Sequence, residues 1–521
     1  MKQNAYSLAW LAVALIAGGG DLAASQWLTF AGNPQRDAWS RDETILSKEN
    51  VKSMQLVWKL RLNSPPSELT SLTAPIIVEN VLTAEGHKDF VVVAGASDTL
   101  DVIDVDTGKL RWHKKFTREG TPRQKPRWLC PNALNATPVI QIGGENPRDR
   151  TIQVVSSDGK LHSLNLVNGE DRKPPADFVP PFSKIWSLNL AGGVLYTATS
   201  QGCNGAKSGV YAMDLNNPGR PVTFYQSDTA GGGIWGRAGA AVGRDGAVYV
   251  ETGDGPVDPA QNKYADSVLA LAPRTLKLTD YYLPENWSWL NRKDLDLGSM
   301  SPVVFPYKQS ELIAGAGKEG RVFLLDPKSL GGPDHHTPLF KSPIYLNEDL
   351  YSGGRGFWGA FASWVDDKNT RWLAVSGWGP LSSKAPAFPL ANGAVHGGAI
   401  LAFKLEENAG KPVLTPAWIS RDMTVPEPPI AANGIVFALA NGENVMQANG
   451  EGRLMDTEQR LKTAPGHAIL YAFDAATGKE LFSSGRTMPS IAHFSGIAIS
   501  NGRVYVTTYD STLYAFGLHE Q

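Results

Sequence analysis

Short segments in which hydrophobic and polar residues alternate recur along the whole chain. The segment 100–112 reads Leu-Asp-Val-Ile-Asp-Val-Asp-Thr-Gly-Lys-Leu-Arg-Trp, and the segment 470–482 reads Leu-Tyr-Ala-Phe-Asp-Ala-Ala-Thr-Gly-Lys-Glu-Leu-Phe. Each begins with an alternating stretch, continues with a polar turn that ends in Gly-Lys, and closes with a stretch that carries an aromatic residue. This order predicts two β-strands joined by a tight turn.

The same phrase returns in weaker form at six further places. These copies lie around Asn165, Asp214, Ala272, Asp326, Lys404 and Gly517. Self-similarity at a spacing of roughly 40 to 80 residues is typical of stacked or circular supersecondary units. Because every unit has β-type alternation, we predict an all-β fold, an eight-bladed β-propeller of four-stranded antiparallel blades. Seven blades remain the alternative, since the copies at Ala272 and Lys404 are poor.

The two ends of the chain are expected to share one blade. The last copy, residues 513–517, has almost no chain after it, so its blade lacks a fourth strand. Residues 56–61 near the N-terminus have the pattern of that missing strand, with Trp58 in the place of Trp112. We therefore expect the N-terminal strand to close the ring, which removes exposed sheet edges.

The composition agrees with one globular domain. Of the 521 residues, 42% are hydrophobic and 19% are charged, which is typical of a globular protein. Fifteen tryptophans suit a repeated aromatic anchor between blades. The net charge of −2 gives no reason to expect nucleic acid or an anionic membrane surface as a partner. Since a ring of blades can take the whole length, we expect a single propeller domain over residues 26–521.

The N-terminus has the pattern of a secretory signal peptide. Lys2 precedes an apolar stretch, Leu8 to Ala17, that is too short to span a bilayer, and residues 23–25 are small enough for cleavage before Gln26. We expect residues 1–25 to be removed and the protein to be periplasmic or secreted. An uncleaved anchor or a buried segment is the alternative. No other apolar run is long enough to span a membrane, so the processed chain is not expected to span one.

Two cysteines occur, Cys130 and Cys203. In an exported protein such a pair indicates a disulfide. No Cys-x-x-Cys-His motif is present, so we expect no attached haem.

The unusual polar and aromatic residues fall in two sets of loops. In a propeller, the loops between blades lie on the same face as the loops that join strands two and three of each blade. This rule places the following residues on one face: Arg127, Trp128, Cys130, Cys203, Trp235, Asp254, Asp294, Asp296, Lys318, Trp358, Trp378 and His493. Singly, each has an ordinary explanation, such as packing between blades or a polar turn. Their joint placement indicates a ligand site at the mouth of the central channel.

The repeated strand-Asp-x-x-x-Gly-Lys-x-x-Trp unit resembles the eight-bladed propeller of the pyrroloquinoline quinone (PQQ) dependent alcohol dehydrogenases and their PQQ-repeat relatives. The resemblance covers residues 27–517. It implies PQQ over the channel mouth, between a Trp and a disulfide of two adjacent cysteines. It also implies a calcium or lanthanide ion held by a Glu and an Asn, an Asp that acts as base, and an Arg or Lys at the quinone oxygens.

Five residues match this site. The resemblance implies that Trp235 stacks on PQQ and that Lys318 contacts the quinone. Asp254 stands where the family has its metal-binding Asn, and an Asp oxygen also suits a hard cation. Asp296 or Asp294 matches the catalytic base.

Two elements depart from the family. The adjacent cysteine pair is missing, and Cys130 stands alone in the corresponding loop. The Glu ligand is also missing, since residues 200–205 read Ser-Gln-Gly-Cys-Asn-Gly. We expect Cys130 and Cys203 to lie at the cofactor position, where a disulfide between them would cross the space that the ring and the metal use in the enzymes. The sequence does not fix the Cα separation that such a bridge requires.

Three functions follow from these features, because the fold alone does not decide among them. The first is a PQQ- and metal-dependent oxidoreductase that acts on an alcohol or sugar hydroxyl and passes electrons to a separate periplasmic cytochrome. The second is a cofactor-free propeller that binds protein partners, as the propeller lipoprotein of outer-membrane assembly does, although no lipobox cysteine is present here. The third is carbohydrate binding at the aromatic mouth through Trp235, Trp358 and Trp378.

Overall fold

The computed structural model describes residues 26–519 except for 145, 147, 218, 228–232, 348–353 and 452. The predicted signal peptide, residues 1–25, lies outside the described residues. Within the described part of the chain, no helix is both long and apolar enough to cross a membrane.

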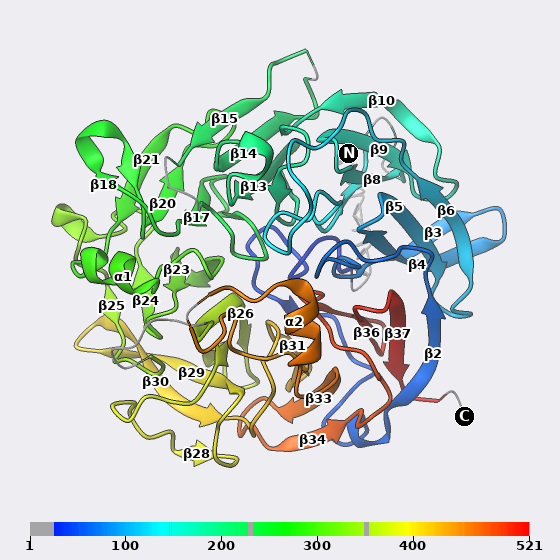
Figure 1. The fold of residues 1–521 in the computed structure, drawn as a ribbon. Coiled ribbons are helices and arrows are strands. Elements are labelled where there is room, and N and C mark those ends of the chain that lie inside the picture. Colours follow the sequence, from blue (N-terminus) through cyan, green and yellow to red (C-terminus); the bar gives the residue numbers. More distant parts are fainter. Residues whose placement is uncertain are drawn as a thin grey trace, which may run out of the picture.

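Eight antiparallel sheets of four strands form a closed ring, as predicted (Figure 1). Blade 1 contains β3 (Ile76–Thr83), β4 (Gly86–Gly95), β5 (Thr99–Asp104) and β6 (Leu110–Lys115). Blade 2 contains β7 (Val139–Ile142), β8 (Arg150–Val155), β9 (Lys160–Asn165) and β10 (Asp171–Asp177). In blade 3, β11 (Lys184–Ile185) and β12 (Asn189–Ala191) share the inner position beside β13 (Val194–Ser200), β14 (Gly209–Asp214) and β15 (Thr223–Gln226).

Blade 4 contains β16 (Ala241–Val242), β17 (Val248–Glu251), β20 (Val268–Leu271) and β21 (Leu278–Tyr282), with a small hairpin of β18 (Val257–Asp258) and β19 (Lys263–Tyr264). Blade 5 contains β22 (Val303–Tyr307), β23 (Ser310–Ala316), β24 (Val322–Leu325) and β25 (Phe340–Lys341). The two poor repeat copies, at Ala272 and Lys404, belong to true blades, the fourth and the sixth.

Blade 6 contains β26 (Gly356–Val365), β27 (Arg371–Trp378), β29 (Gly398–Asn408) and β30 (Lys411–Ile419), with β28 (Leu390–Ala391) added parallel to β30 at its outer edge. Blade 7 contains β31 (Ile430–Ala432), β32 (Ile435–Ala440), β33 (Ile469–Asp474) and β34 (Glu480–Ser483), with β1 (Trp39–Ser40) parallel to β31. Blade 8 contains β35 (Ile497–Ser500), β36 (Arg503–Thr507) and β37 (Thr512–Gly517).

The N-terminal strand closes the ring, as predicted. β2 (Gln55–Arg61) pairs antiparallel with β37, with Lys59 opposite Tyr514, and supplies the outer strand of blade 8. Figure 1 shows blue β2 beside red β37. The pairing leaves no open edge between the first and the last blade.

The repeated phrase has a packing role between blades. The indole nitrogen of Trp58 donates to the carbonyl oxygen of Val105 in the next blade at 2.9 Å. Gly108 lies against the Trp58 ring with a φ of +63°, and a side chain there would stand 2.6 Å from the ring. The same arrangement recurs for Trp112 with Leu166 and Gly169, and for Trp418 with Ala475 and Gly478. In these three cases, the glycine turn of one blade therefore packs against the tryptophan of the preceding blade.

An N-terminal segment that was not predicted as a structural element runs inside the ring. Backbone carbonyls of residues 27–38 accept hydrogen bonds from the inner strands of six blades. The pairs are Trp27 with Ile77, Leu28 with Ile140, Pro34 with Val242, Gln35 with Val304, Asp37 with Ser363, and Ala38 with Ala431. Arg36 is fully buried there and donates to backbone carbonyls of Phe30, Leu188 and Ala240. This segment, which we call the inner clasp, ties the blades to one another at the axis.

The helices and 3-10 turns lie in the loops. They are α1 (Trp287–Lys293), α2 (Thr457–Lys462), η1 (Val51–Ser53), η2 (Cys203–Gly205), η3 (Pro259–Gln261) and η4 (Gly332–Asp334). Residues 442–468, the long connection between β32 and β33, carry α2 over the centre of the ring (Figure 1). There the indole nitrogen of Trp128 donates to the carbonyl oxygen of Met455 at 2.8 Å. This connection covers part of the channel mouth.

Candidate functional site

A cavity of about 570 Å³ opens at the channel mouth. Loops between blades contribute Arg127, Trp235, Asp294 and Asp296 to its wall, and loops between strands two and three contribute Gln201, Asp254 and Lys318. The predicted shared face is therefore present. Small-molecule sites typically enclose roughly 300–1,000 Å³ and combine aromatic walls with a few polar groups, and this cavity has both.

Three carboxylates converge on one side of the cavity. Asp254 follows β17, and Asp294 and Asp296 follow α1. One oxygen of each lies within 4.8 Å of an oxygen of the others. Asp294 ends α1 in a left-handed conformation with a φ of 54°, and its amide donates back to Leu290. This turn brings two acids that are two positions apart in the sequence to the same cavity.

Lys318 lies between these carboxylates and the aromatic wall. Its Nζ is 2.6 Å from Oδ1 of Asp294 and 2.7 Å from Oδ1 of Asp296. The same ammonium stands 4.8 Å from the centre of the Trp235 ring. Burial alone would lower the pKa of Lys318, but the Asp296 and Asp294 carboxylates outweigh it and raise the pKa above its usual value. Lys318 is therefore a fixed positive charge.

A hydrogen bond and close contact with backbone atoms hold Trp235 in place. Its indole nitrogen donates to Oδ2 of Asp296 at 3.0 Å. A side chain at Gly253 would stand 2.8 Å from that nitrogen, and one at Gly298 would stand 2.5 Å from it. These two glycines let the Trp235 indole lie flat against the backbone, so its orientation is set before any ligand enters.

Of the other two predicted aromatic residues, Trp358 lines the cavity beside Trp235, and Trp378 lies behind them. Trp358 meets the Trp235 ring edge-on, with 5.0 Å between centres, and stacks on Trp378 at 4.4 Å. Trp378 is buried and does not line the cavity. Trp378 thus packs between loops, whereas Trp235 is half-buried and offers an aromatic surface to the cavity.

The acidic side of the cavity holds more carboxyl groups than its single lysine balances. Burial and the nearby Asp296 raise the pKa of Asp254 to about 9. Burial raises the pKa of Asp296 as well, despite Lys318. Glu251 and Asp266, which the sequence did not single out, are fully buried beside them, and burial holds their pKa values well above the usual range. The site has acid groups in excess in its metal-free form.

This donor set fits a hard cation. Oδ1 of Asp254, Oε2 of Glu251 and both oxygens of Asp266 are buried without a hydrogen-bond partner among the described residues. Buried carboxylates are normally paired or coordinate a metal, and carboxylate oxygens are the ligands of calcium-like ions.

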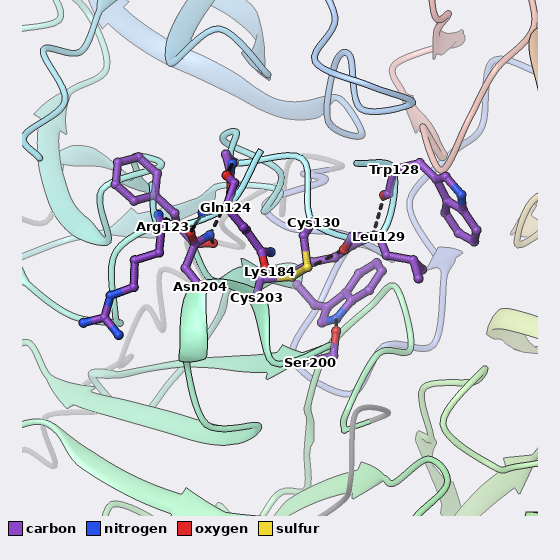
Figure 2. The surroundings of a disulfide bond; sticks show 12 residues. Arg123, Gln124, Trp128, Leu129, Cys130, Lys184, Ser200, Cys203 and Asn204 are labelled. Atoms are coloured by element: carbon purple, nitrogen blue, oxygen red, sulfur yellow. Dashed lines mark hydrogen bonds between the residues drawn. A yellow bond between two sulfur atoms is a disulfide. The ribbon is translucent and has the colours of Figure 1, made fainter. Parts of the chain in front are cut away.

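Cys130 and Cys203 form a disulfide with a Cα–Cα distance of 5.5 Å (Figure 2). The predicted pair is therefore present. Both residues are buried, and the cavity is lined by their neighbours Trp128, Leu129 and Gln201 instead. The bridge lies in the cavity wall rather than across the cavity. A direct contact of Cys130 or Cys203 with a cofactor stays a prediction.

The loop of residues 200–205, where the sequence resemblance leads one to expect a Glu, has a structural role. The side-chain amide of Asn204 donates to Oδ1 of Asn132 and to the carbonyl oxygen of Phe182, at 2.7 and 2.8 Å. Its oxygen accepts from the backbone amide of Arg123 at 2.8 Å. Figure 2 shows Asn204 beside Arg123 and Gln124. Together with the disulfide, Asn204 fixes the loop that carries Trp128.

Comparison with known proteins agrees with this architecture. The sequence profile of a family described as outer membrane protein assembly factor BamB matches residues 38–220. No curated protein sequence matches the chain. The quinohemoprotein alcohol dehydrogenase from Comamonas testosteroni aligns over 95% of this chain and 81% of its own, with 15% identity and a TM-score of 0.59. A europium-containing methanol dehydrogenase aligns over 95% and 98%, with 13% identity and a TM-score of 0.60.

The chain has the PQQ-repeat propeller fold of the quinoprotein alcohol dehydrogenases.

Within this propeller fold, the cavity has one further residue that was not predicted from the sequence, Lys184. Lys184 opens blade 3 and is only 6% exposed. Its Nζ lies 3.4 Å from the carbonyl oxygen of Trp128, and burial followed by the Arg460 charge lowers its pKa to about 7. The local sequence around Lys184 carries no signal of this burial, since the covering residues come from blade 2 and from the connection that carries α2.

Proposed function

We propose that the protein is a PQQ- and metal-dependent oxidoreductase that acts on the hydroxyl of an alcohol or a sugar. The convergence of Asp254, Asp294 and Asp296 on Lys318 and Trp235 in one cavity carries the proposal. The propeller fold that the chain shares with quinoprotein alcohol dehydrogenases supports it. The sequence resemblance supports it too, because it assigns Trp235, Asp254, Asp296 and Lys318 to the family's site.

Asp254 and Trp235 would bind the ion and the cofactor. Asp254, with its unpartnered buried oxygen, would hold a calcium or lanthanide ion together with a neighbouring carboxylate. Trp235 would offer its face to the quinone, and its bond to Asp296 keeps that face in place. When bound, PQQ and its ion supply the hydride acceptor and a Lewis acid.

The remaining residues would handle the proton and the developing charge. Asp296 would accept the hydroxyl proton as hydride leaves the substrate carbon. The Asp294 side chain is 30% exposed, so it would pass the proton on to cavity water. Lys318 would donate to an oxygen that gains negative charge. The wall formed by Trp128, Trp358 and the connection that carries α2 would limit the access of water.

The cellular setting belongs to the same proposal. The N-terminal pattern supports a periplasmic or secreted protein. Because the chain has no haem attachment motif, electrons would leave to a separate cytochrome.

A titration of purified protein with PQQ tests the proposal, with calcium, with lanthanum and without added metal, followed by quinone absorbance and calorimetry. We expect metal-dependent 1:1 binding that is lost in Trp235→Ala and in Asp254→Ala. Asp106→Ala removes an exposed carboxylate on a rim turn and should leave binding unchanged. Absence of binding with every metal, from a protein that circular dichroism shows to be folded, would sink the proposal and favour a cofactor-free binding propeller.

A further inference from the structure

A second, smaller cavity of about 40 Å³, which we call the axial cavity, lies beside the inner clasp, between the start of blade 3 and the loops that lead into blades 1, 2, 4 and 8. Lys184, Trp186 and Phe494 line both this cavity and the larger one at the mouth. Phe30 of the inner clasp lines it too. Because a cavity of about 10–15 Å³ is enough for one water molecule, this axial cavity has room for a small ion and little more.

Two buried cationic side chains line this cavity and lack full pairing. Arg237 is 4% exposed and pairs through Nη1 with Glu427, while its Nε and Nη2 have no hydrogen-bond partner among the described residues. Its guanidinium lies 3.8 Å from the centre of the Phe494 ring. Lys184 has a long contact of 3.4 Å to a carbonyl oxygen and stands 5.2 Å from the Trp186 ring centre. Neither contact supplies a negative charge.

The buried charged groups around the axis carry a positive excess. Four cationic side chains, Arg36, Lys184, Arg237 and Arg460, accompany two carboxylates, Glu427 and Glu443, and all six are buried. Glu427 forms an ion pair with Arg237. Glu443 pairs with Arg460 at 2.7 Å and with His493 at 2.5 Å. Burial lowers the pKa of His493, despite Glu443, so that ring adds no charge at neutral pH. Within this group, Lys184 has no acidic partner.

We propose that the axial cavity binds one small inorganic anion, such as chloride, against the Lys184 ammonium and the unpaired N–H groups of Arg237. A buried charge is costly unless it is paired, and an anion would pair both groups at once or one of them through a water molecule. Side chains of Thr73, Asn135 and Thr137 on the same wall offer further hydrogen-bond donors. The small volume selects a monatomic or similarly compact anion.

The site differs from the proposed quinone site, although Lys184, Trp186 and Phe494 line both cavities, and its test does not depend on bound quinone. The acidic groups of the quinone site lie in a loop of blade 4 and in the loop between blades 4 and 5. The axial cavity is lined by the start of blade 3 and by the loops that lead to blades 1, 2, 4 and 8. Bound anion would also restore a charged Lys184, whose pKa burial and Arg460 otherwise lower to about 7.

Thermal unfolding of the PQQ-free protein tests this site. Sodium chloride, sodium bromide and sodium gluconate are compared at one ionic strength, because gluconate is too large for the cavity. We expect the unfolding temperature to rise saturably with chloride and bromide and not with gluconate, as for a ligand that binds only the folded state. The rise should vanish in Lys184→Met and persist in Lys125→Met, which removes an exposed lysine.

Crystals of the unmodified protein soaked in bromide give a second test that needs no variant. An anomalous peak in the axial cavity, within hydrogen-bond distance of Lys184 or Arg237, is the expected result. The proposal is overturned if bromide occupies only surface positions, or if chloride and gluconate act alike on the unfolding temperature. Since PQQ is absent, a carboxylate of the cofactor cannot produce either signal.

Discussion

The pKa values of single residues at the mouth of this propeller depend more on burial than on the neighbouring residues in the sequence. Lys184 shows this best. It is surrounded by Trp128, Trp186 and Arg460, and its pKa falls from 10.5 to about 7 through burial and the Arg460 charge. Between pH 7 and 10.5 the unfolded chain binds a proton at this lysine that the folded protein does not. The contribution of Lys184 to the free energy of unfolding therefore rises with pH across that window.

Replacing Lys184 by Met should remove this dependence. We expect Lys184→Met to raise the free energy of unfolding at pH 6, where the buried charge is present, and to have a much smaller effect at pH 10, where the folded lysine is neutral. Urea unfolding of both proteins in chloride-free buffer at pH 6 and pH 10 measures this change in the free energy of unfolding. Lys125→Met should show no such difference, and an equal effect of Lys184→Met at both pH values would contradict the interpretation.

The candidate site was partly predictable at this scale. Trp235, Asp254, Asp296 and Lys318 stand in loops whose side of the ring follows from strand order, so the sequence could place them together. Glu251 and Asp266 were not predicted because two structural properties distinguish them. Both are fully buried, and both have carboxylate oxygens without a hydrogen-bond partner among the described residues. Those properties depend on how blades 4 and 5 pack, which no local pattern states.

At the scale of elements, the repeated phrase is a contact between blades as much as a pair of strands. Trp418 on β30 donates to the carbonyl oxygen of Ala475 in the next blade at 2.9 Å, and Gly478 lies under its ring. The glycine serves twice, because its φ of +69° disfavours a side chain and because a side chain would stand 2.4 Å from the Trp418 ring. The alternating strands and these turns were predictable because each is encoded within about a dozen residues.

Two glycines of blade 7 allow these effects to be separated. Gly485 has a φ of +55° and nothing within 4 Å of an added side chain, whereas Gly478 meets Trp418. We expect Gly485→Ala to lower the free energy of unfolding by about 1–2 kcal/mol, the cost of a left-handed alanine. Gly478→Ala should cost a further 1–3 kcal/mol or so for displacing a packed ring. Urea unfolding of both variants decides it, and equal losses would refute the docking role of Gly478.

The paths of the long connections were less predictable from the sequence than the blades. The repeat shows where a connection leaves a blade and returns, but its path depends on distant partners. Residues 442–468 reach the mouth because Trp128 and Arg460 meet there, with the Arg460 guanidinium 4.7 Å from the Trp128 ring centre. Neither residue belongs to a repeat copy, so this cover was not predictable from the sequence pattern.

At the scale of the whole molecule, the disulfide joins the loop before blade 2 to a loop of blade 3 and so encloses blade 2. Its two cysteines are 73 positions apart. A loop of that length corresponds to about 4 kcal/mol of stabilisation in the chain-entropy treatment of the unfolded state. The bridge also holds the loop that carries Trp128 and Leu129 against the cavity.

Replacing both cysteines by alanine should therefore lower the free energy of unfolding by about 4 kcal/mol and make the midpoint insensitive to reductant. Denaturant unfolding with and without dithiothreitol measures both effects, with the unmodified protein as the control. A double variant as stable as the parent under oxidising conditions would show that the bridge constrains the unfolded chain little.

The ring and its closing strand were predictable because both follow from counting repeat copies and finding one strand short. The inner clasp was not, because residues 27–38 show no regular alternation and their partners are spread over six blades. Only the closed ring brings those partners within reach of one short segment.

The inner clasp and β2 also set the order in which the molecule can be completed. Both precede the eight blades in the sequence, yet β2 pairs with β37, which follows all the other strands of the ring. Blades can form one after another during synthesis, but the earliest segment must wait, unpaired, for almost the whole chain to appear. Meanwhile the growing stack of blades exposes a strand edge open to foreign pairing. A chain that stops before β37 would leave β2 without its pairing partner, so the closure of the ring depends on a strand made after all the other blades.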